Sequence, residues 1–134
     1  MSIILDFNGS KGAASPVSRY GFIIVLNSGQ FTENGFSGNP LFIGNANAQA
    51  TLLRADGGSF DFSAIDFAAG DPAINVTFVA SNGQSSTYQT SSPPSSLETH
   101  QLSPAFENVT SVTWSQGVAG VDAYVFNNLV VNWR

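Results

Sequence analysis

The chain has 134 residues, a formal net charge of −5 and no cysteine. Only 10% of its residues are charged, against roughly 25% in an average soluble domain. Four lysines and arginines in total cannot form the basic patch that neutralises a phosphate backbone, so the composition excludes a nucleic-acid-binding protein. The absence of cysteine excludes disulfides and thiolate metal sites.

The length fits one domain, residues 1–134, since domains run at about 100–150 residues. No apolar run reaches the roughly 18 residues that a transmembrane helix needs, so we expect no transmembrane segment. Met1–Asp6 lacks the basic start of a signal peptide, and Asp6 interrupts its apolar stretch. The compartment stays open: a mature extracellular chain is slightly favoured, and a cytosolic chain without a signal peptide is the alternative.

Short runs of alternating apolar and polar residues predict strands from the N terminus onward. Ile3–Phe7 alternates in this way, and Asn8–Ser18 predicts a loop of small residues. The strand predicted at Tyr20–Leu26 is apolar on both faces over its last five residues, which indicates burial on both sides. Turn-forming residues fill 30–40, and Leu41–Ile43 predicts a short strand.

The middle of the chain continues the same pattern. Thr51–Ala55 predicts a strand that ends at Asp56-Gly57-Gly58, where the Asp-Gly pair is a strong hairpin signal. Ile74–Ala80 is the most regular alternating strand, 81–84 predicts a hairpin turn, and 85–90 predicts the polar return strand.

A change of parity interrupts the strand predicted over residues 59–69. Phe60 and Phe62 share one face, whereas Ile65 and Phe67 lie at positions of the opposite parity. Because a one-residue shift turns every side chain over, a straight strand cannot keep all four inward. We therefore predict a β-bulge or bend at Ser63-Ala64.

Strands predicted at 97–102, 109–115 and 121–133 complete the chain. The total is about ten short strands at spacings near 8–12 residues, which is typical of a β-sandwich or barrel. The apolar residues show no helical periodicity. The prediction is an all-β fold, a single antiparallel β-sandwich. Its polarity comes mostly from Ser, Asn, Thr and Gly, which suits both turns and a surface for neutral hydroxylated ligands.

Several segments carry a resemblance to a known group. They read ILDF, PVSRYGF, DGGSFDFSAIDFAAG, INVTFVASNGQ, NVTSVTWSQG and YVFNNLVVN. The pattern resembles β-sandwich domains of bacterial secreted or surface-anchored proteins of the PEP-CTERM type and of fungal proteins. Their fold is similar to jelly-roll carbohydrate-binding modules and galactose-binding-like domains. The resemblance covers most of the chain and implies a sandwich of jelly-roll type.

The resemblance also raises a structural calcium. Related jelly rolls often hold this ion between a carboxylate on the first strand and one near the last. Asp6 matches the first position, but Asn127 stands where the group has its second carboxylate. Calcium takes six to eight oxygen ligands. A calcium site at Asp6 and Asn127 is one interpretation, and Asp6 as a solvated strand residue is the other. No cofactor is otherwise required.

Catalytic patterns are weak. His100, the single histidine, lies in a plain strand pattern, and no Gly-x-Ser-x-Gly elbow is present. Asp61 and Asp66 are the obvious carboxylate pair for glycoside hydrolysis, but the expected bulge between them leaves their facing open. We therefore expect no enzyme.

We predict non-catalytic carbohydrate binding by a small lectin or carbohydrate-binding module. A shallow loop site would stack an aromatic ring on a sugar and bond its hydroxyls through neutral groups. The amphipathic aromatics are Tyr20, Tyr88, Trp114, Tyr124 and Trp133. We select Tyr88, which lies in a polar strand, and Trp114, for which a core position is the alternative. The polar candidates are Arg54, Asp56, Asn39 and Asn82. For Arg54, the alternative role is an exposed ion pair with Asp56.

The expected partner is a glycan or polysaccharide, which the sequence does not name. A homo-oligomer would raise a weak single-site affinity through multivalency. Two other classes stay open: a structural or adhesive self-assembling protein, and a small glycoside hydrolase or cyclase with an apolar cavity.

Overall fold

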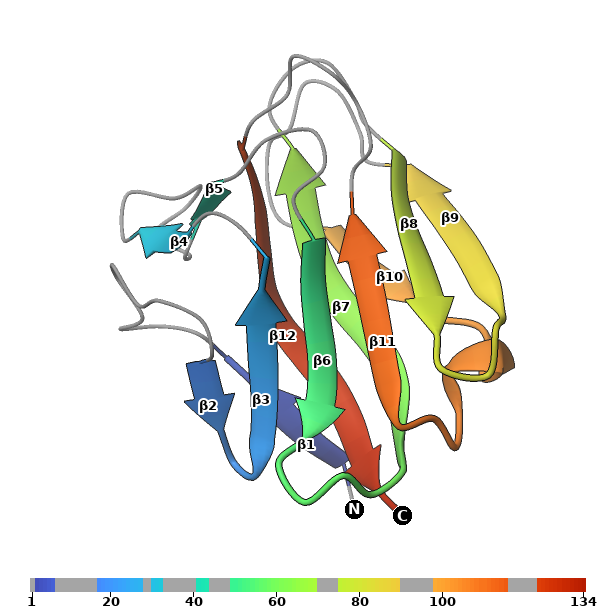
Figure 1. Ribbon diagram of the computed structural model, residues 1–134. Coiled ribbons are helices and arrows are strands. Elements are labelled where there is room, and N and C mark those ends of the chain that lie inside the picture. The colour runs from blue at the N-terminus through green and yellow to red at the C-terminus, as the bar shows by residue number, and fades with distance from the viewer. Residues whose placement is uncertain are drawn as a thin grey trace.

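The computed structural model describes residues 2–6, 17–27, 30–32, 41–43, 49–69, 75–89, 98–115 and 123–134. These residues form twelve β-strands and one short 3₁₀ helix at Pro104–Phe106. The strands make two antiparallel six-stranded sheets that face each other as a β-sandwich (Figure 1), which confirms the predicted fold class. Among the described helices, none is long and apolar enough to cross a membrane.

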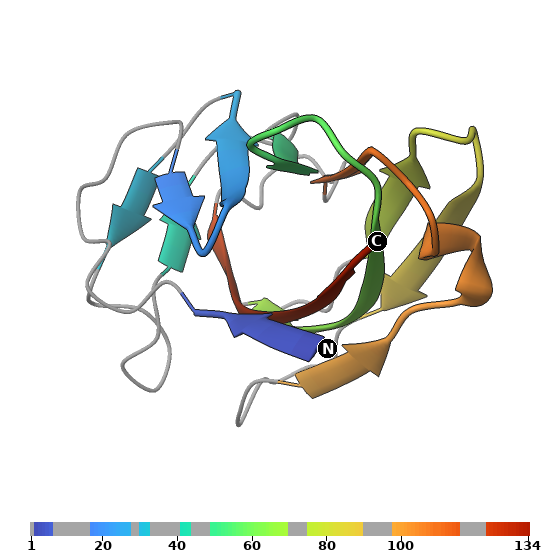
Figure 2. The same ribbon diagram turned by 90° about the horizontal axis from the view of Figure 1, so that it is seen from below.

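Sheet A has the strand order β10-β7-β12-β5-β4, and β1 also pairs with β12. Its strands are β1 (Ser2–Leu5), β4 (Gln30–Thr32), β5 (Leu41–Ile43), β7 (Phe60–Ala69), β10 (Glu98–Gln101) and β12 (Ala123–Trp133). Sheet B has the order β2-β3-β6-β11-β8-β9. Its strands are β2 (Val17–Arg19), β3 (Phe22–Leu26), β6 (Gln49–Arg54), β8 (Asn75–Ala80), β9 (Ser85–Gln89) and β11 (Ser111–Ser115). Figure 2 views the two sheets from below, on opposite sides of the core.

Two of these strands lie where the sequence predicted loops. β2 falls in the segment expected to be a small-residue loop, and β4 falls in the turn-rich segment 30–40. Each has three residues and pairs with a single neighbour, β3 or β5, at the edge of its sheet. Strands this short carry too few residues to show an alternating pattern in the sequence.

The core lies between the inner faces of the two sheets. Its largest fully buried side chains are Phe22, Phe60, Phe62, Phe78, Phe106, Trp114 and Phe126. They form a connected aromatic cluster in which Trp114 stacks on Phe78 and meets Phe126 edge-on, with centroids 5.6 and 5.3 Å apart. Truncating one such aromatic side chain typically costs about 3–5 kcal/mol, so this cluster holds the sheets together.

Strand β3 corrects one expectation. Burial on both sides was predicted, but Ile23 is only half-buried and Val25 is exposed, while their neighbours are buried. β3 lies inside sheet B, between β2 and β6, and no element of the described chain covers its outer face. Continuous apolar sequence therefore marks a sheet face that is open in this protein.

The predicted irregularity in β7 is confirmed. Val130 of β12 pairs with Ala64 of β7, but the next residue, Val131, pairs with Phe62, so Ser63 is the extra residue. This bulge restores the inward direction of the apolar residues on both sides of it. A second register shift lies in β12 between Asn127 and Val130.

The turn at Asp56-Gly57-Gly58 is not a hairpin. β6 pairs with β3 and β11 in sheet B, whereas β7 pairs with β10 and β12 in sheet A, so the turn carries the chain from one sheet to the other. The local chemistry is that of a tight turn: Gly57 has a φ of +78° and its N–H donates to the Arg54 carbonyl at 3.0 Å. Turn chemistry sets the reversal of the chain but not the partner of the next strand.

Candidate functional site

One end of the sandwich gathers three segments that are distant in sequence. The β2–β3 turn, the β6–β7 loop and the C-terminal end of β12 all lie at the lower end in Figure 1. We define the basal surface as Tyr20, Arg54, Asp56, Trp133 and Arg134. Tyr20 is 65% exposed and Trp133 is 40% exposed, so this end presents two large aromatic side chains to solvent.

Tyr20 occupies a backbone position that disfavours it. Tyr20 and Gly21 alone connect β2 to β3, and Arg19 pairs with Phe22 across the turn. The φ angles are +50° at Tyr20 and +82° at Gly21, the signs of a two-residue type I′ hairpin. Such turns favour Asn, Asp or Gly, and a bulky residue there is strained. The high exposure of Tyr20 shows that core packing does not account for the strain.

Trp133 is held from several sides. The Cζ atom of Arg54 lies 4.2 Å from the centroid of its ring, a cation–π contact. Phe22 of the opposite sheet meets the ring at 5.2 Å and 64°. A Cβ atom at Gly21 would lie 2.8 Å from Cη2 of Trp133, so only glycine fits there without a shift. The indole is therefore fixed in orientation while part of it stays open.

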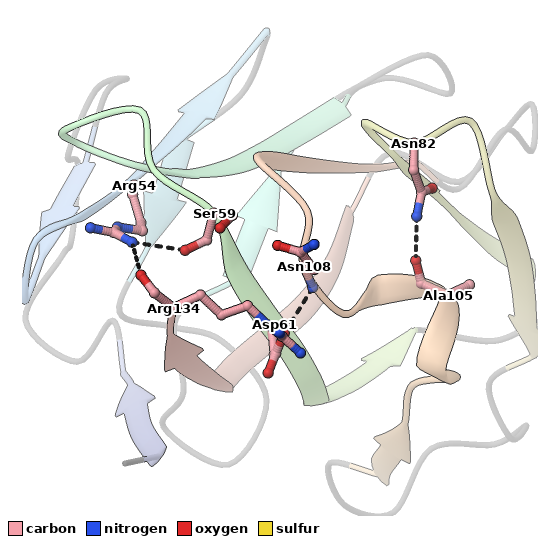
Figure 3. A network of polar contacts seen from close by, with 7 residues as sticks. All are labelled: Arg54, Ser59, Asp61, Asn82, Ala105, Asn108 and Arg134. Carbon is pink, nitrogen blue, oxygen red and sulfur yellow. Dashed lines mark hydrogen bonds and ion pairs between the residues drawn. The ribbon is translucent and has the colours of Figure 1, made fainter.

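Arg54 ties the β6–β7 loop to the C-terminal end of β12 (Figure 3). Its Nη1 donates to the carbonyl of Ser59 at 2.8 Å and to that of Arg134 at 3.0 Å. Its Nη2 donates to Asp56 at 2.5 Å. The mostly buried Arg54 side chain is thus a structural tie, and the expected ion pair with Asp56 is present.

Asp56 is the exposed acceptor of this network. The N–H of Gly58 donates to it at 2.9 Å. This hydrogen bond, followed by that from Arg54, holds the pKa of Asp56 below its usual value. At neutral pH the basal surface therefore carries an exposed carboxylate beside its aromatic rings, and a carboxylate accepts hydrogen bonds from hydroxyl groups.

Asp61 anchors the last residue of the basal surface. Nε of Arg134 donates to Asp61 at 2.6 Å, and the N–H of Asn108 donates to the same oxygen at 2.8 Å (Figure 3). Burial raises the pKa of Asp61, but these bonds outweigh it, and the pKa lies below its usual value. Asp61 in turn raises the pKa of Arg134. The Arg134 side chain stays partly exposed.

The structure corrects the selection of Trp114. Its side chain is 1% exposed and packs against Phe62, Phe78 and Phe126 inside the core. No face of the ring is open to a sugar, so Trp114 leaves the set of candidate binding residues. The alternative considered from the sequence, a core tryptophan, is confirmed.

Tyr88 and Asn82 both contact the segment 103–105, which follows β10. Tyr88 of β9 is half-buried against the core, meets His100 edge-on at 5.9 Å, and accepts a hydrogen bond from the Ser103 N–H at 3.2 Å. Asn82 lies in the confirmed β8–β9 hairpin turn, where it accepts from Gln84 and donates to Ala105. Both side chains have structural partners. Asn39 lies outside the described residues.

The residues predicted for calcium come close in register. Leu5 pairs with Leu129, so Asp6 directly follows the end of β1, and Asn127 lies two residues before Leu129 on β12. Asn127 is buried and neutral, which adds no charge to the set. No group of three His, Asp or Glu side chains suited to a metal occurs in the described part of the chain. Asp6 and Asn127 supply an incomplete ligand set, and calcium stays a prediction.

The second carboxylate considered for hydrolysis, Asp66, is held by its neighbours. Thr99 donates to one oxygen at 2.6 Å and Asn128 to the other at 2.9 Å. Asn128 has a φ of +52° within the irregular part of β12, which directs its amide to Asp66. Asp61 and Asp66 are thus both engaged in hydrogen bonds across neighbouring strands.

The reasoning from sequence named Tyr20 and Trp133 among the amphipathic aromatics but did not select them. Tyr20 had a readable signal, because a tyrosine before glycine sits where a two-residue turn prefers asparagine. Trp133 had no such signal, because it continues the alternation of Leu129 and Val131, which are buried, and so its position predicts a core residue. Its exposure arises only because β12 ends at the open edge of the sandwich.

The fold is similar to known carbohydrate-binding modules. No protein-family model matches the chain. No curated protein matches it either. A solved family 29 carbohydrate-binding module matches with a TM-score of 0.63 and 15% identity, covering 97% of this chain and 86% of that one. Variants of such a module solved with mannohexaose and with cellulohexaose match with TM-scores of 0.62 and 0.63, at 14% and 15% identity, over 97% of this chain and 89% of each of theirs. At this identity, the likeness establishes the fold.

Proposed function

We propose that residues 1–134 form one non-catalytic carbohydrate-binding module whose ligand binds at the basal surface. The observation that carries the proposal is Tyr20: a strained, highly exposed aromatic residue whose neighbour Gly21 packs against a second exposed ring, Trp133. Strained backbone at the surface persists where function requires it, and here it displays a ring that stability alone would not retain. The structural neighbours, solved with a mannohexaose and a cellulohexaose, support a neutral oligosaccharide as ligand.

The basal surface supplies the two kinds of contact that a sugar requires. The rings of Tyr20 and Trp133 offer apolar faces for the C–H face of a pyranose. Asp56 and Arg134, which are both hydrogen-bonded to Arg54, would bond the hydroxyls of the sugar. Arg54 fixes the orientation of the Trp133 ring through its cation–π contact. The site is shallow, so single-site affinity is weak and binding strength depends on several contacts at once.

The proposal retains Arg54 and Asp56 from the sequence-based candidates and adds Tyr20, Trp133 and Arg134. A contact of Tyr88 with ligand stays a prediction. No cofactor enters the binding step, because stacking and hydrogen bonds are sufficient. The resemblance to PEP-CTERM-type domains also stays a prediction.

Titration calorimetry with cellohexaose and mannohexaose tests the proposal. We expect Trp133→Ala and Tyr20→Ala each to weaken binding at least tenfold, a change of about 1.4 kcal/mol. Ile4→Ala is the matched control, since Ile4 is a 57% exposed apolar side chain on sheet A. Unchanged affinity in both aromatic variants, with the fold retained by circular dichroism, would refute the basal site.

A further inference from the structure

The outer face of sheet B has no charged residue among its described positions. In β3, β6, β11 and β8 the buried residues alternate with residues that point away from the core, and β9 continues this alternation at the edge. We call these outward positions the hydroxyl face: Ser18, Ile23, Val25, Gln49, Thr51, Leu53, Asn75, Thr77, Val79, Ser85, Thr87, Gln89, Ser111, Thr113 and Ser115. Each is a hydroxyl, an amide or an aliphatic side chain.

Strand register arranges these groups in rows across the sheet. Thr51 pairs with Thr113, and their hydroxyls are hydrogen-bonded at 2.8 Å. One strand further, Thr113 pairs with Val79. Thr77 and Thr87 form a second bonded hydroxyl pair at 2.9 Å on β8 and β9. The result is an ordered array of hydroxyls interspersed with methyl groups on a continuous sheet.

The lack of charge is specific to this face. The chain carries a net charge of −5. On sheet A, Asp61 and Asp66 lie at outward positions of β7, each beside a buried neighbour. The remaining described charges of sheet B, Arg19 and Arg54, lie at strand ends and reach toward the other sheet or the basal loop. Charged residues make up 10% of the whole chain, and none of them occupies a described outward position of sheet B.

We propose that the hydroxyl face is a second carbohydrate-binding surface, one that lies flat on an insoluble neutral polysaccharide. Packed polysaccharide chains present hydroxyl edges and C–H faces without charge, which complements rows of threonine hydroxyls and β-branched methyl groups. A neutral face gives an anionic polymer no charge to pair with, so the partner we propose is a neutral polysaccharide, tested here as a glucan and a mannan. This inference depends on carbohydrate as the ligand class of the proposed function but not on the basal surface.

The hydroxyl face differs from the basal surface in the kind of ligand it would bind. It offers no aromatic ring among its described residues, so a single short chain gains little there. Many weak contacts made simultaneously by a rigid array bind an extended solid surface far better than a free oligosaccharide. Binding to solid polysaccharide therefore reports on the hydroxyl face, and binding to soluble hexaose reports on the basal surface.

Sedimentation of the whole chain with microcrystalline cellulose and with insoluble mannan tests the inference. We expect Val79→Lys and Val79→Glu to lower the partition constant at least fivefold, because either charge is desolvated against a neutral surface. Val79 is 45% exposed, so both variants should fold. Ile4→Lys, on the opposite sheet, is the matched control and should stay within twofold of the wild type. Hexaose affinity should not change in any of the three.

Several outcomes overturn the inference. Wild-type chain that pellets with neither polysaccharide overturns it, as does equal pelleting of the wild type and both Val79 variants. Loss of all pelleting in Trp133→Ala shows that the basal surface alone binds the solid. A wild-type dimer in analytical ultracentrifugation that Val79→Lys dissociates shows a second copy on this face instead. Failure of the basal site alone is distinguishable, because then Trp133→Ala keeps its hexaose affinity while Val79→Lys still stops pelleting.

Discussion

The guanidinium of Arg54, at the end of β6, stacks on the indole of Trp133, at the end of β12, with Cζ 4.2 Å from the ring centroid. The contact joins sheet B to sheet A at the edge of the core. It also fixes an exposed ring and a cation in one arrangement, so that packing and the proposed binding chemistry depend on the same pair.

Gly58→Ala should disturb this pair without unfolding the protein. A Cβ atom at Gly58 would lie 2.6 Å from Cζ of Arg54, so the guanidinium must move and lose part of its contacts with Ser59, Arg134 and Asp56. We expect a stability loss of about 1–2 kcal/mol and hexaose binding weakened about tenfold. Urea denaturation and calorimetry measure the two effects.

Gly57→Ala is the matched control for that variant. A Cβ at Gly57 meets nothing within 4 Å, but its φ of +78° strains an alanine. It should therefore lose about 1 kcal/mol of stability and keep its hexaose affinity. The interpretation of the Arg54–Trp133 pair is wrong if Gly58→Ala binds hexaose like the wild type.

Tyr20→Asn should stabilise the protein and remove binding. Asparagine tolerates the positive φ of +50°, so releasing the strain of tyrosine should raise the free energy of unfolding by about 0.5–1 kcal/mol. Loss of the ring should weaken hexaose binding at least tenfold. Tyr20→Phe keeps both the ring and the strain and should match the wild type in both measurements. A Tyr20→Asn protein that is less stable than the wild type contradicts the strain argument.

Trp114→Phe should separate a core role from a binding role. The smaller ring leaves a cavity among Phe62, Phe78 and Phe126, so we expect a loss of about 1–3 kcal/mol in the free energy of unfolding. Hexaose affinity should stay within twofold, because no part of Trp114 reaches the surface. A folded variant with abolished binding would return Trp114 to the site.

Asp61 should make stability depend on pH in acid. Its pKa is lowered in the folded protein, so the stability it contributes is present above the unfolded value of about 3.9 and is lost as the pH falls below it. Asp61→Asn should cost about 1 kcal/mol at neutral pH. This difference should disappear toward about pH 2, where the wild-type carboxyl is protonated.

Urea unfolding of both proteins at several pH values measures this effect, and Arg134→Gln is the control. Since Arg134 donates to Asp61, the two substitutions should be less than additive in the double variant. A destabilisation that is equally large at every pH means that the carboxylate charge of Asp61 is not what stabilises the network.

Local patterns predicted much of the fold but only part of the site. The parity change between Phe62 and Ile65 located the bulge at Ser63, because alternation along one strand is a property of neighbouring residues. The same kind of signal at Asp56-Gly57 led to the wrong partner for β6, because the turn is local and strand pairing is not. For the site, Arg54 and Asp56 were found through their spacing around a turn, whereas Trp114 and Trp133 could not be told apart.

The sequence by itself determined the all-β class, the alternation of buried and exposed residues, the bulge and a surface poor in charge. These features depend on composition and on neighbours along the chain. Only the tertiary structure decided which tryptophan is buried, which loops meet at the basal surface and which sheet face is free of charge. Those properties depend on contacts between distant segments. Thr51 and Thr113 become neighbours only when β6 and β11 pair within sheet B, and Trp133 and Gly21 only when the two sheets pack together.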